Sequence, residues 1–418
     1  MTWSTLLGRW LAAAALLAAT FSGSRLSAAD AKPPSRLVTG EQAVQWLSKG
    51  SEPRKLIALE SLRWNSPHDA AYTRAIIDGL TDAAGRRTIP PSQFRATRVL
   101  AGSPLPEADV ALQRLLTAVD WRLQMTAADA LGERGTESAA SPLLQCWSTP
   151  AAVENYALRH AVVCALGDLK GTQGLDGLIR LLPELDGQLR YEAVSRLMLR
   201  TGENRGDKTE EWVAWQSGRD PNWSGRIVTD DLPAEIPWNR VLPRFFRVPI
   251  YAKRVLFVVD MSGSMKSTVE GKTRLEATQD ELTNAIKALP EDSLFGVIAF
   301  NDRVQPWHLQ PMVATSENKQ AAIRAIWTLS AQGRTAINDA LETALGYSGY
   351  LEQILLLSDG KPTAGKLVDN AAIIANITGR NEFRRVRIDT IGLDSSGEAE
   401  RLLEQLSEQN HGQYHKLR

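Results

Sequence analysis

The sequence predicts a multidomain protein in which an all-α solenoid of helix pairs precedes an α/β domain with a doubly wound, mostly parallel sheet. Three observations predict this division. A motif of small residues and leucine recurs in the first half of the chain, apolar runs alternate with amphipathic helical patterns after residue 253, and a Trp-rich zone separates the two regions. At 418 residues, the chain is long enough for two sizeable cores and too long for one ordinary core.

The composition is that of a folded protein. Hydrophobic residues make up 43% and charged residues 23% of the chain, which is ordinary for globular domains. The 48 Lys and Arg residues balance the 48 Asp and Glu residues, and no run of like charges forms a basic arm. We therefore expect no nucleic-acid partner.

The first residues have the pattern of an export signal. Arg9 ends a short polar start, and an apolar run of about a dozen residues follows, which is too short to span a bilayer comfortably. Small residues then offer cleavage after Ala29 or Ala31. This pattern predicts a signal peptide over residues 1–29 and export to the periplasm, the cell surface or the medium. An uncleaved membrane anchor is the alternative, and no later stretch is apolar enough to span a membrane.

A repeated helical pattern covers residues 41–201. In each copy small residues precede a leucine, and the leucines are 38, 31, 35 and 31 residues apart. A period in the thirties built from helix pairs is typical of an α-solenoid. The copies resemble HEAT repeats of the short, phycobilisome-lyase-like kind. The leucine anchors are Leu62, Leu100, Leu131, Leu166 and Leu197.

Helix packing gives this pattern a physical reason. Small residues on one face let helices approach closely, and a second apolar helix follows, for example at 138–147 and at 175–182. One pair cannot bury its apolar face alone, so the pairs must stack. In three copies a glycine follows the leucine, and we expect it at a helix C-terminus, where φ is positive. These glycines are Gly102, Gly132 and Gly167.

The chain has two cysteines, Cys146 and Cys164. Both lie in apolar helical patterns, which predicts that they are buried as small hydrophobic side chains. An exported protein of this size does not need a disulfide framework. Export would nevertheless allow a bridge between the two, so the sequence leaves the bridge open.

Residues 202–250 form a separate zone with four tryptophans, Trp212, Trp215, Trp223 and Trp238. A flexible linker has little use for so many large aromatic side chains. The zone is therefore either an ordered connector between the two domains or a local cap on the last repeat.

An α/β domain is expected over residues 253–418. Continuous apolar runs that alternate with amphipathic helices predict a mostly parallel sheet covered on both faces. The predicted strands are 255–259, 294–300, 354–357 and 386–393. The predicted helices are 275–289, 318–329, 336–345, 367–378 and 398–409.

Oxygen-bearing side chains lie next to three of these elements. Asp260 ends the first strand, and Ser262 and Ser264 follow it in the next turn. Thr335 precedes a helix, and Asp359 ends the third strand. Because ligands bind at the carboxyl ends of parallel strands, we expect these five residues to converge at one edge of the sheet.

This pattern resembles the metal-ion-dependent adhesion site of von Willebrand factor type A domains. Asp260, Ser262 and Ser264 match its Asp-x-Ser-x-Ser motif, Thr335 its threonine, and Asp359 its Asp-Gly pair. Hydroxyl and carboxylate oxygens suit a hard cation. The resemblance therefore implies a Mg²⁺ site, with Mn²⁺ or Ca²⁺ as alternatives. A metal-free copy with a decayed site is the opposing interpretation.

In the family, one coordination position stays open for an acidic side chain of a protein partner. The resemblance therefore implies an exported, non-enzymatic binding or adhesion-type protein, with the helical repeats as a second interaction surface. Two other functions stay open, namely a scaffold in which the repeats bind and the α/β domain is a spacer, and a component that assists an enzyme complex.

Three cations flank the motifs in sequence, namely Lys266, Arg334 and Lys361. Arg334 stands where the family usually has a small residue. One hypothesis is a positive rim that attracts an acidic partner and speeds encounter. The alternative is that these side chains are solvated and point away from the site.

An enzyme is the main opposing class. The serine turn lacks a Gly-x-Ser-x-Gly elbow, and there is no Walker loop or dinucleotide-binding glycine motif. None of the histidines lies in a catalytic order or in metal-ligand spacing, so we expect no catalytic residues. The histidines are His68, His160, His308, His411 and His415.

Overall fold

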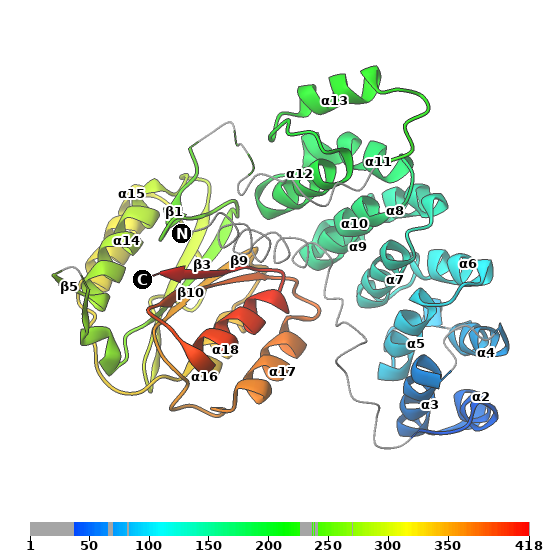
Figure 1. Ribbon diagram of the computed structural model, residues 1–418, viewed down its shortest axis with the longest axis horizontal. Helices are drawn as coiled ribbons and strands as arrows, with labels where there is room; N and C mark the ends of the chain where they lie inside the picture. The colour runs from blue at the N-terminus through cyan, green and yellow to red at the C-terminus, as the bar shows by residue number, and fades with distance from the viewer. Residues whose placement is uncertain are drawn as a thin grey trace, which may run out of the picture. The chain divides into compact units, whose positions relative to one another are not determined.

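The structure is a computed structural model that describes residues 37–65, 70–81, 83–225, 236, 238, 241–269 and 271–417 (Figure 1). The predicted signal peptide over residues 1–29 lies outside these residues. The chain divides into two compact units, one helical and one α/β, with Asp186–Tyr191 grouped with the α/β unit. No helix in the described part of the chain is both long enough and apolar enough to cross a membrane.

The helical unit consists of paired helices, as predicted. Each predicted leucine anchor lies on the inner helix of a pair and is at most 2% exposed. The inner helices are α3 (Glu52–Asn65), α5 (Pro91–Ala101), α7 (Trp121–Arg134), α10 (Tyr156–Asp168) and α12 (Gly187–Thr201). The other helices are α2 (Gly40–Lys49), α4 (Ala70–Leu80), α6 (Pro106–Leu115), α8 (Ala140–Trp147), α9 (Pro150–Glu154), α11 (Gln173–Leu181) and α13 (Thr209–Gly218).

The prediction that glycines end the inner helices was wrong for Gly132 and Gly167, which lie inside α7 and α10. Gly102 does end α5, but its φ of -80° is not the positive value expected. Gly132 is needed for close packing, because a Cβ there would lie 2.8 Å from the Cα of Ala165. The α7 helix instead ends at Gly135, whose φ of 66° is left-handed. The small residues Gly132 and Ala165 therefore allow α7 and α10 to approach closely.

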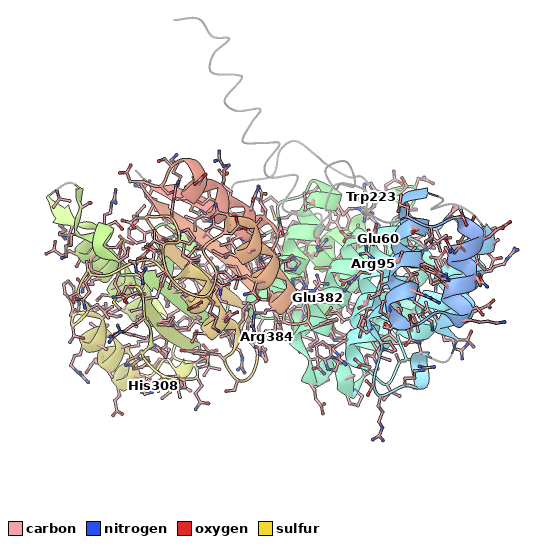
Figure 2. The ribbon with its side chains drawn as sticks, turned by 90° about the horizontal axis from the view of Figure 1, so that it is seen from below. Glu60, Arg95, Trp223, His308, Glu382 and Arg384 are labelled. Atoms are coloured by element: carbon pink, nitrogen blue, oxygen red, sulfur yellow. The ribbon has the colours of Figure 1, made fainter. Side chains whose placement is uncertain are left out.

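Arginine side chains connect successive helix pairs. Arg134 of α7 donates to the carbonyl of Leu100 at 3.1 Å and to Asp109 of α6 at 2.8 Å. Glu60 of α3 and Arg95 of α5 form a further ion pair between inner helices (Figure 2). A cation at the carbonyl end of a helix interacts favourably with the helix dipole. These polar contacts therefore stabilise the stack in addition to its apolar packing.

The Trp-rich zone contains helix α13, which packs on the last helix pair. Trp212 is fully buried, and the rings of Trp215 and Trp223 are 5.3 Å apart. Arg219 lies over Trp215 and donates to Asp176 of α11 at 2.7 Å. This part of the zone therefore caps the repeat that precedes it.

Both cysteines are free thiols, so the bridge that the sequence left open is not formed. Cys146 is buried as expected, and burial raises the pKa of its thiol to about 11. Cys164 is partly exposed and lies beside His160, so its expected burial is incomplete.

The α/β unit is built on a seven-stranded sheet with the order β11-β10-β9-β3-β6-β7, in which β8 also pairs with β6. The strands are β3 (Arg254–Asp260), β6 (Leu294–Phe300), β7 (Val304–Pro306), β8 (Met312–Val313), β9 (Gln353–Ser358), β10 (Arg387–Leu393) and β11 (Tyr414–Leu417). β3, β6, β9, β10 and β11 are parallel. β7 and β8 run antiparallel to β6. The mostly parallel sheet is as predicted.

Helices cover both faces of this sheet (Figure 1). α14 (Arg274–Ala288) and α15 (Ser316–Ile326) pack on the face that carries Phe257 and Val259. α16 (Ile337–Leu345), α17 (Asn370–Asn381) and α18 (Gly397–Glu408) pack on the face that carries Leu256 and Val258. Burial on both faces explains why the strands are continuous apolar runs.

Two short hairpins complete the α/β unit. The first pairs β1 (Arg244–Phe245) with β2 (Val248–Pro249). The second pairs β4 (Thr268–Val269) with β5 (Lys272–Thr273). Thr273 also caps α14 through a reciprocal capping box with Glu276. The second hairpin therefore sets where α14 begins.

A cluster on α16 generates a pH-dependent prediction. Glu342 accepts hydrogen bonds from Lys366 at 2.6 Å and from Asn376 at 2.9 Å, and it pairs with Arg380 at 3.0 Å. The contacts with Lys366 and Asn376 lower its pKa to about 2. Because the folded-state pKa is below the unfolded value of about 4.3, this stability is present above that value and is lost as the pH falls toward 2.

We expect Glu342→Gln to destabilise the protein by about 1 kcal/mol at pH 7, a small value because both cations are at least half exposed. The difference from wild type should shrink as the pH falls from about 4.3. Thermal denaturation between pH 2.5 and 7 measures this, with the exposed Glu291→Gln as a control. A difference that is constant with pH would contradict the assignment.

Candidate metal centre

The site begins at the carboxyl end of the central strand β3. Asp260, the last residue of β3, is fully buried. One carboxylate oxygen accepts a hydrogen bond from the backbone N–H of Ser262 at 2.7 Å, and the other accepts from the hydroxyl of Ser358 at 2.6 Å. β3 lies between β6 and β9, where the chain turns from one half of the sheet to the other, so this edge is the switch point expected of a ligand site.

A chain of side-chain hydrogen bonds joins this strand to the neighbouring one. The hydroxyls of Ser262 and Ser264 are 3.0 Å apart, and Ser264 donates to Asp359 Oδ1 at 2.7 Å. The side chain of Asp359 is fully buried, whereas Ser264 is exposed. Four of the five predicted residues therefore lie together, and the group opens to solvent at Ser264.

Thr335 is positioned by its loop. Gly263 N–H donates to the carbonyl of Gly333 at 3.0 Å, and Gln332 N–H donates to the carbonyl of Met261 at 2.9 Å. These two bonds hold the loop that carries Thr335 against the turn that carries the serines. Thr335 itself is 5% exposed, so the fifth predicted residue is buried on the loop that contacts the serine turn.

Gly333 fixes the shape of this loop. Its φ of 76° is left-handed, and a Cβ there would lie 2.2 Å from Asp302 Oδ1. Both the conformation and the close carboxylate therefore require glycine. Arg334 follows directly and is exposed.

Arg274 contacts the site and was not foreseen from the sequence. This first residue of α14 pairs with Asp359 Oδ2 at 2.8 Å and with Asp394 at 2.7 Å. Asp359 thus accepts a hydrogen bond from Ser264 through one oxygen and pairs with the guanidinium group of Arg274 through the other. No spacing rule identifies such a residue, because it becomes a neighbour only when α14 starts at the same edge of the sheet.

The electrostatics of the group favour a bound cation. Burial raises the pKa of Asp260 to about 6, against hydrogen bonds from Ser358 and Ser262 that lower it, while the charge of Asp359 raises it further. Arg274 compensates Asp359, whereas Asp260 contacts neutral donors. A buried carboxylate with neutral neighbours is stabilised by a nearby metal ion. The donors are all oxygens, which suits a hard divalent cation.

The three flanking cations differ in their surroundings. Arg334 and Lys266 are exposed on the loops that carry Thr335 and the serines. Lys361 instead forms an ion pair with Glu398 at the start of α18. The hypothesis of a positive rim therefore rests on Arg334 and Lys266.

Comparisons with known proteins identify the family that the α/β unit matches. The family model described as "von Willebrand factor type A domain" matches residues 253–416. Inter alpha-trypsin inhibitor, heavy chain 4, from Mus musculus is 32% identical over 140 residues, which are 31% of this chain and 14% of that relative. Inter-alpha-trypsin inhibitor heavy chain H3 from Bos taurus is 28% identical over 159 residues, which are 34% of this chain and 17% of that relative.

The match thus spans less than a fifth of either relative. Among solved structures, von Willebrand factor type A from Catenulispora acidiphila is 22% identical, with a TM-score of 0.35, over 41% of this chain and 40% of that chain. The helical unit precedes the residues that the family model matches. Residues 253–416 of this chain are a von Willebrand factor type A domain.

Proposed function

We propose that this chain is an exported, non-enzymatic binding protein that captures a protein partner through a Mg²⁺ ion at Asp260, Ser262, Ser264, Thr335 and Asp359. An acidic side chain of the partner completes the shell of the ion, and the helical repeats offer a second interaction surface. The observation that carries this proposal is the hydrogen-bonded chain from Asp260 to Asp359 at one edge of the sheet.

The donor set supports Mg²⁺ rather than a softer metal. Three hydroxyls and two carboxylates supply oxygen ligands, and the described site contains no histidine or cysteine. Mn²⁺ and Ca²⁺ accept the same donors. The protein's own contribution is to fix the carboxylates, because Ser358 and the Ser262 amide orient Asp260 while Arg274 orients Asp359.

Binding fits the site better than catalysis does. The serines contact each other and a carboxylate, whereas a nucleophilic serine needs a base within hydrogen-bond reach. The relatives compared above are heavy chains of inter-alpha-trypsin inhibitor. A scaffold in which the repeats bind and the type A domain is a spacer is the second candidate, because the stacked helix pairs form an extended surface. Assistance to an enzyme complex is the third.

The first test is capture of partners from the exported fraction with and without a chelator. We expect capture by wild type to require Mg²⁺ and capture by Asp260→Asn to fail. Thermal denaturation separates this from misfolding. Mg²⁺ at 100 times its dissociation constant should stabilise wild type by about 2.7 kcal/mol, and the variant should not respond.

The variant should fold, because an Asn amide can keep both contacts of Asp260. Its oxygen accepts from Ser262 N–H, and its nitrogen can donate to the Ser358 hydroxyl. Without metal, we expect it to be at least as stable as wild type at pH 7.5, since it buries no charge. Asp280→Asn on the α14 surface is the matched control. Metal-independent capture by a folded Asp260→Asn would favour the scaffold.

Arg274 generates a further prediction about metal affinity. Its guanidinium lies 2.8 Å from Asp359 Oδ2, and a positive charge so close to a ligand oxygen opposes a cation. We expect Arg274→Gln to bind Mg²⁺ about three- to tenfold more tightly, by reduced charge repulsion in a partly screened site. Isothermal titration calorimetry measures this. Weaker binding would show that the arginine acts chiefly by holding Asp359 in place.

The rim hypothesis predicts an effect on association rate. We expect Arg334→Gln to slow association with a partner recovered in the chelator-sensitive capture by about two- to fivefold at low salt, with little effect at high salt. Arg324→Gln on α15 is the control, since Arg324 is exposed on a different element. Surface plasmon resonance across salt concentrations measures both. If the association rates of Arg334→Gln and wild type depend equally on salt concentration, the rim hypothesis is wrong.

A further inference from the structure

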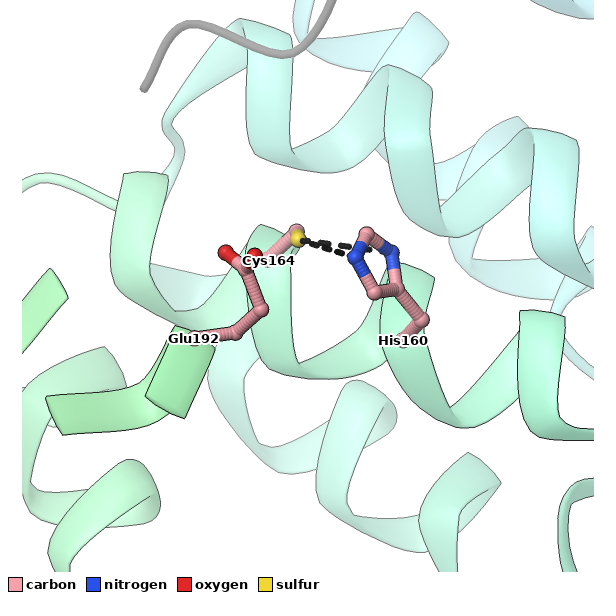
Figure 3. A group of neighbouring side chains, drawn as sticks. All are labelled: His160, Cys164 and Glu192. Carbon is pink, nitrogen blue, oxygen red and sulfur yellow. Dashed lines mark hydrogen bonds between the residues drawn. The ribbon is translucent and has the colours of Figure 1, made fainter. Parts of the chain in front are cut away.

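A second group of ligand-type side chains lies in the helical unit. Among the described residues, His160, Cys164 and Glu192 form the group whose ligand atoms all lie within 4.8 Å of one another (Figure 3). His160 and Cys164 are one turn apart on α10, so both side chains leave the same face of that helix. Glu192 comes from α12.

The sulfur–nitrogen distance suits shared coordination. Zn–S and Zn–N bonds of about 2.3 and about 2.1 Å that meet at a tetrahedral angle separate sulfur from nitrogen by about 3.6 Å. Cys164 Sγ lies 3.6 Å from His160 Nδ1 and 3.9 Å from Nε2. The helix therefore already holds two ligands at the spacing that one metal ion requires. Figure 3 shows the carboxylate of Glu192 turned toward the sulfur from the other helix.

Burial and access also fit a metal ion. His160 is 3% and Glu192 is 7% exposed, so the ligands are fixed by packing rather than free in solvent. Cys164 is partly exposed, so the group is not sealed from solvent on every side. Cys146, the other thiol, is buried.

The charges of the neighbourhood balance when a dication is present. A thiolate on Cys164 and the carboxylate of Glu192 neutralise a divalent ion, and Arg196 pairs with Asp168.

We propose that His160, Cys164 and Glu192 bind a divalent transition-metal ion of the Zn²⁺ class, with three protein ligands and one position for water. Sulfur and imidazole ligands select such an ion over Mg²⁺. This site is separate from the Asp260 site in position and in donor chemistry, and it does not depend on the function proposed for the type A domain.

The test uses the full chain, reduced and saturated with Mg²⁺, titrated with Co²⁺ and then with Zn²⁺. We expect one Co²⁺ per chain, a thiolate-to-cobalt charge-transfer band in the near ultraviolet, and loss of the band on Zn²⁺ addition. Cys164→Ser should lose the band and bind Zn²⁺ at least tenfold more weakly. Cys146→Ser and Asp260→Asn should behave as wild type.

Glu192→Gln gives a second variant, in case Cys164→Ser does not fold. It should keep the charge-transfer band and bind Zn²⁺ at least tenfold more weakly. Absence of the band in wild type would overturn the proposal and leave a simple thiol–imidazole hydrogen bond. A band that survives in folded Cys164→Ser, or that disappears in Cys146→Ser, would also overturn it.

Discussion

The candidate adhesion site depends on one constraint, which is that two carboxylates are buried close together at the carboxyl edge of a parallel sheet. Asp260 is fully buried at the end of the central strand, and the side chain of Asp359 is buried directly after the neighbouring strand β9. Ser262 and Ser264 bridge them, while Arg274 holds the outer oxygen of Asp359. The serine turn, the Gly333 loop and the start of α14 are all arranged around this pair.

How far the sequence predicts this arrangement depends on the range of the interactions. Long apolar runs such as residues 294–300 predicted their strands, because both faces of the sheet are covered. β7 and β8 were missed, since strands of three and two residues carry too little pattern. The residues of the metal-site motif were predicted through a family resemblance. Arg274 was missed, because its role arises from where α14 begins.

In the helical unit, too, features that depend on tertiary contacts could not be predicted from the sequence. The period of its leucines predicted stacked helix pairs, and the anchors Leu131 and Leu166 are fully buried. The role of Gly132 was predicted wrongly, because a glycine near the end of an apolar pattern fits both a helix cap and a close contact. Likewise, His160 and Cys164 are four residues apart on one helix, yet Glu192 joins them only once α12 stacks against α10.

The two candidate sites differ in the class of metal ion that their donor atoms favour. Asp260 and its neighbours supply oxygen donors, which bind hard cations and give a transition metal no thiolate or imidazole. His160 and Cys164 supply nitrogen and sulfur, to which Mg²⁺ has little affinity. Each site therefore favours a different class of ion. If both sites bind as proposed, Mg²⁺ would control capture by the type A domain, and the transition metal would connect two helix pairs of the repeat region.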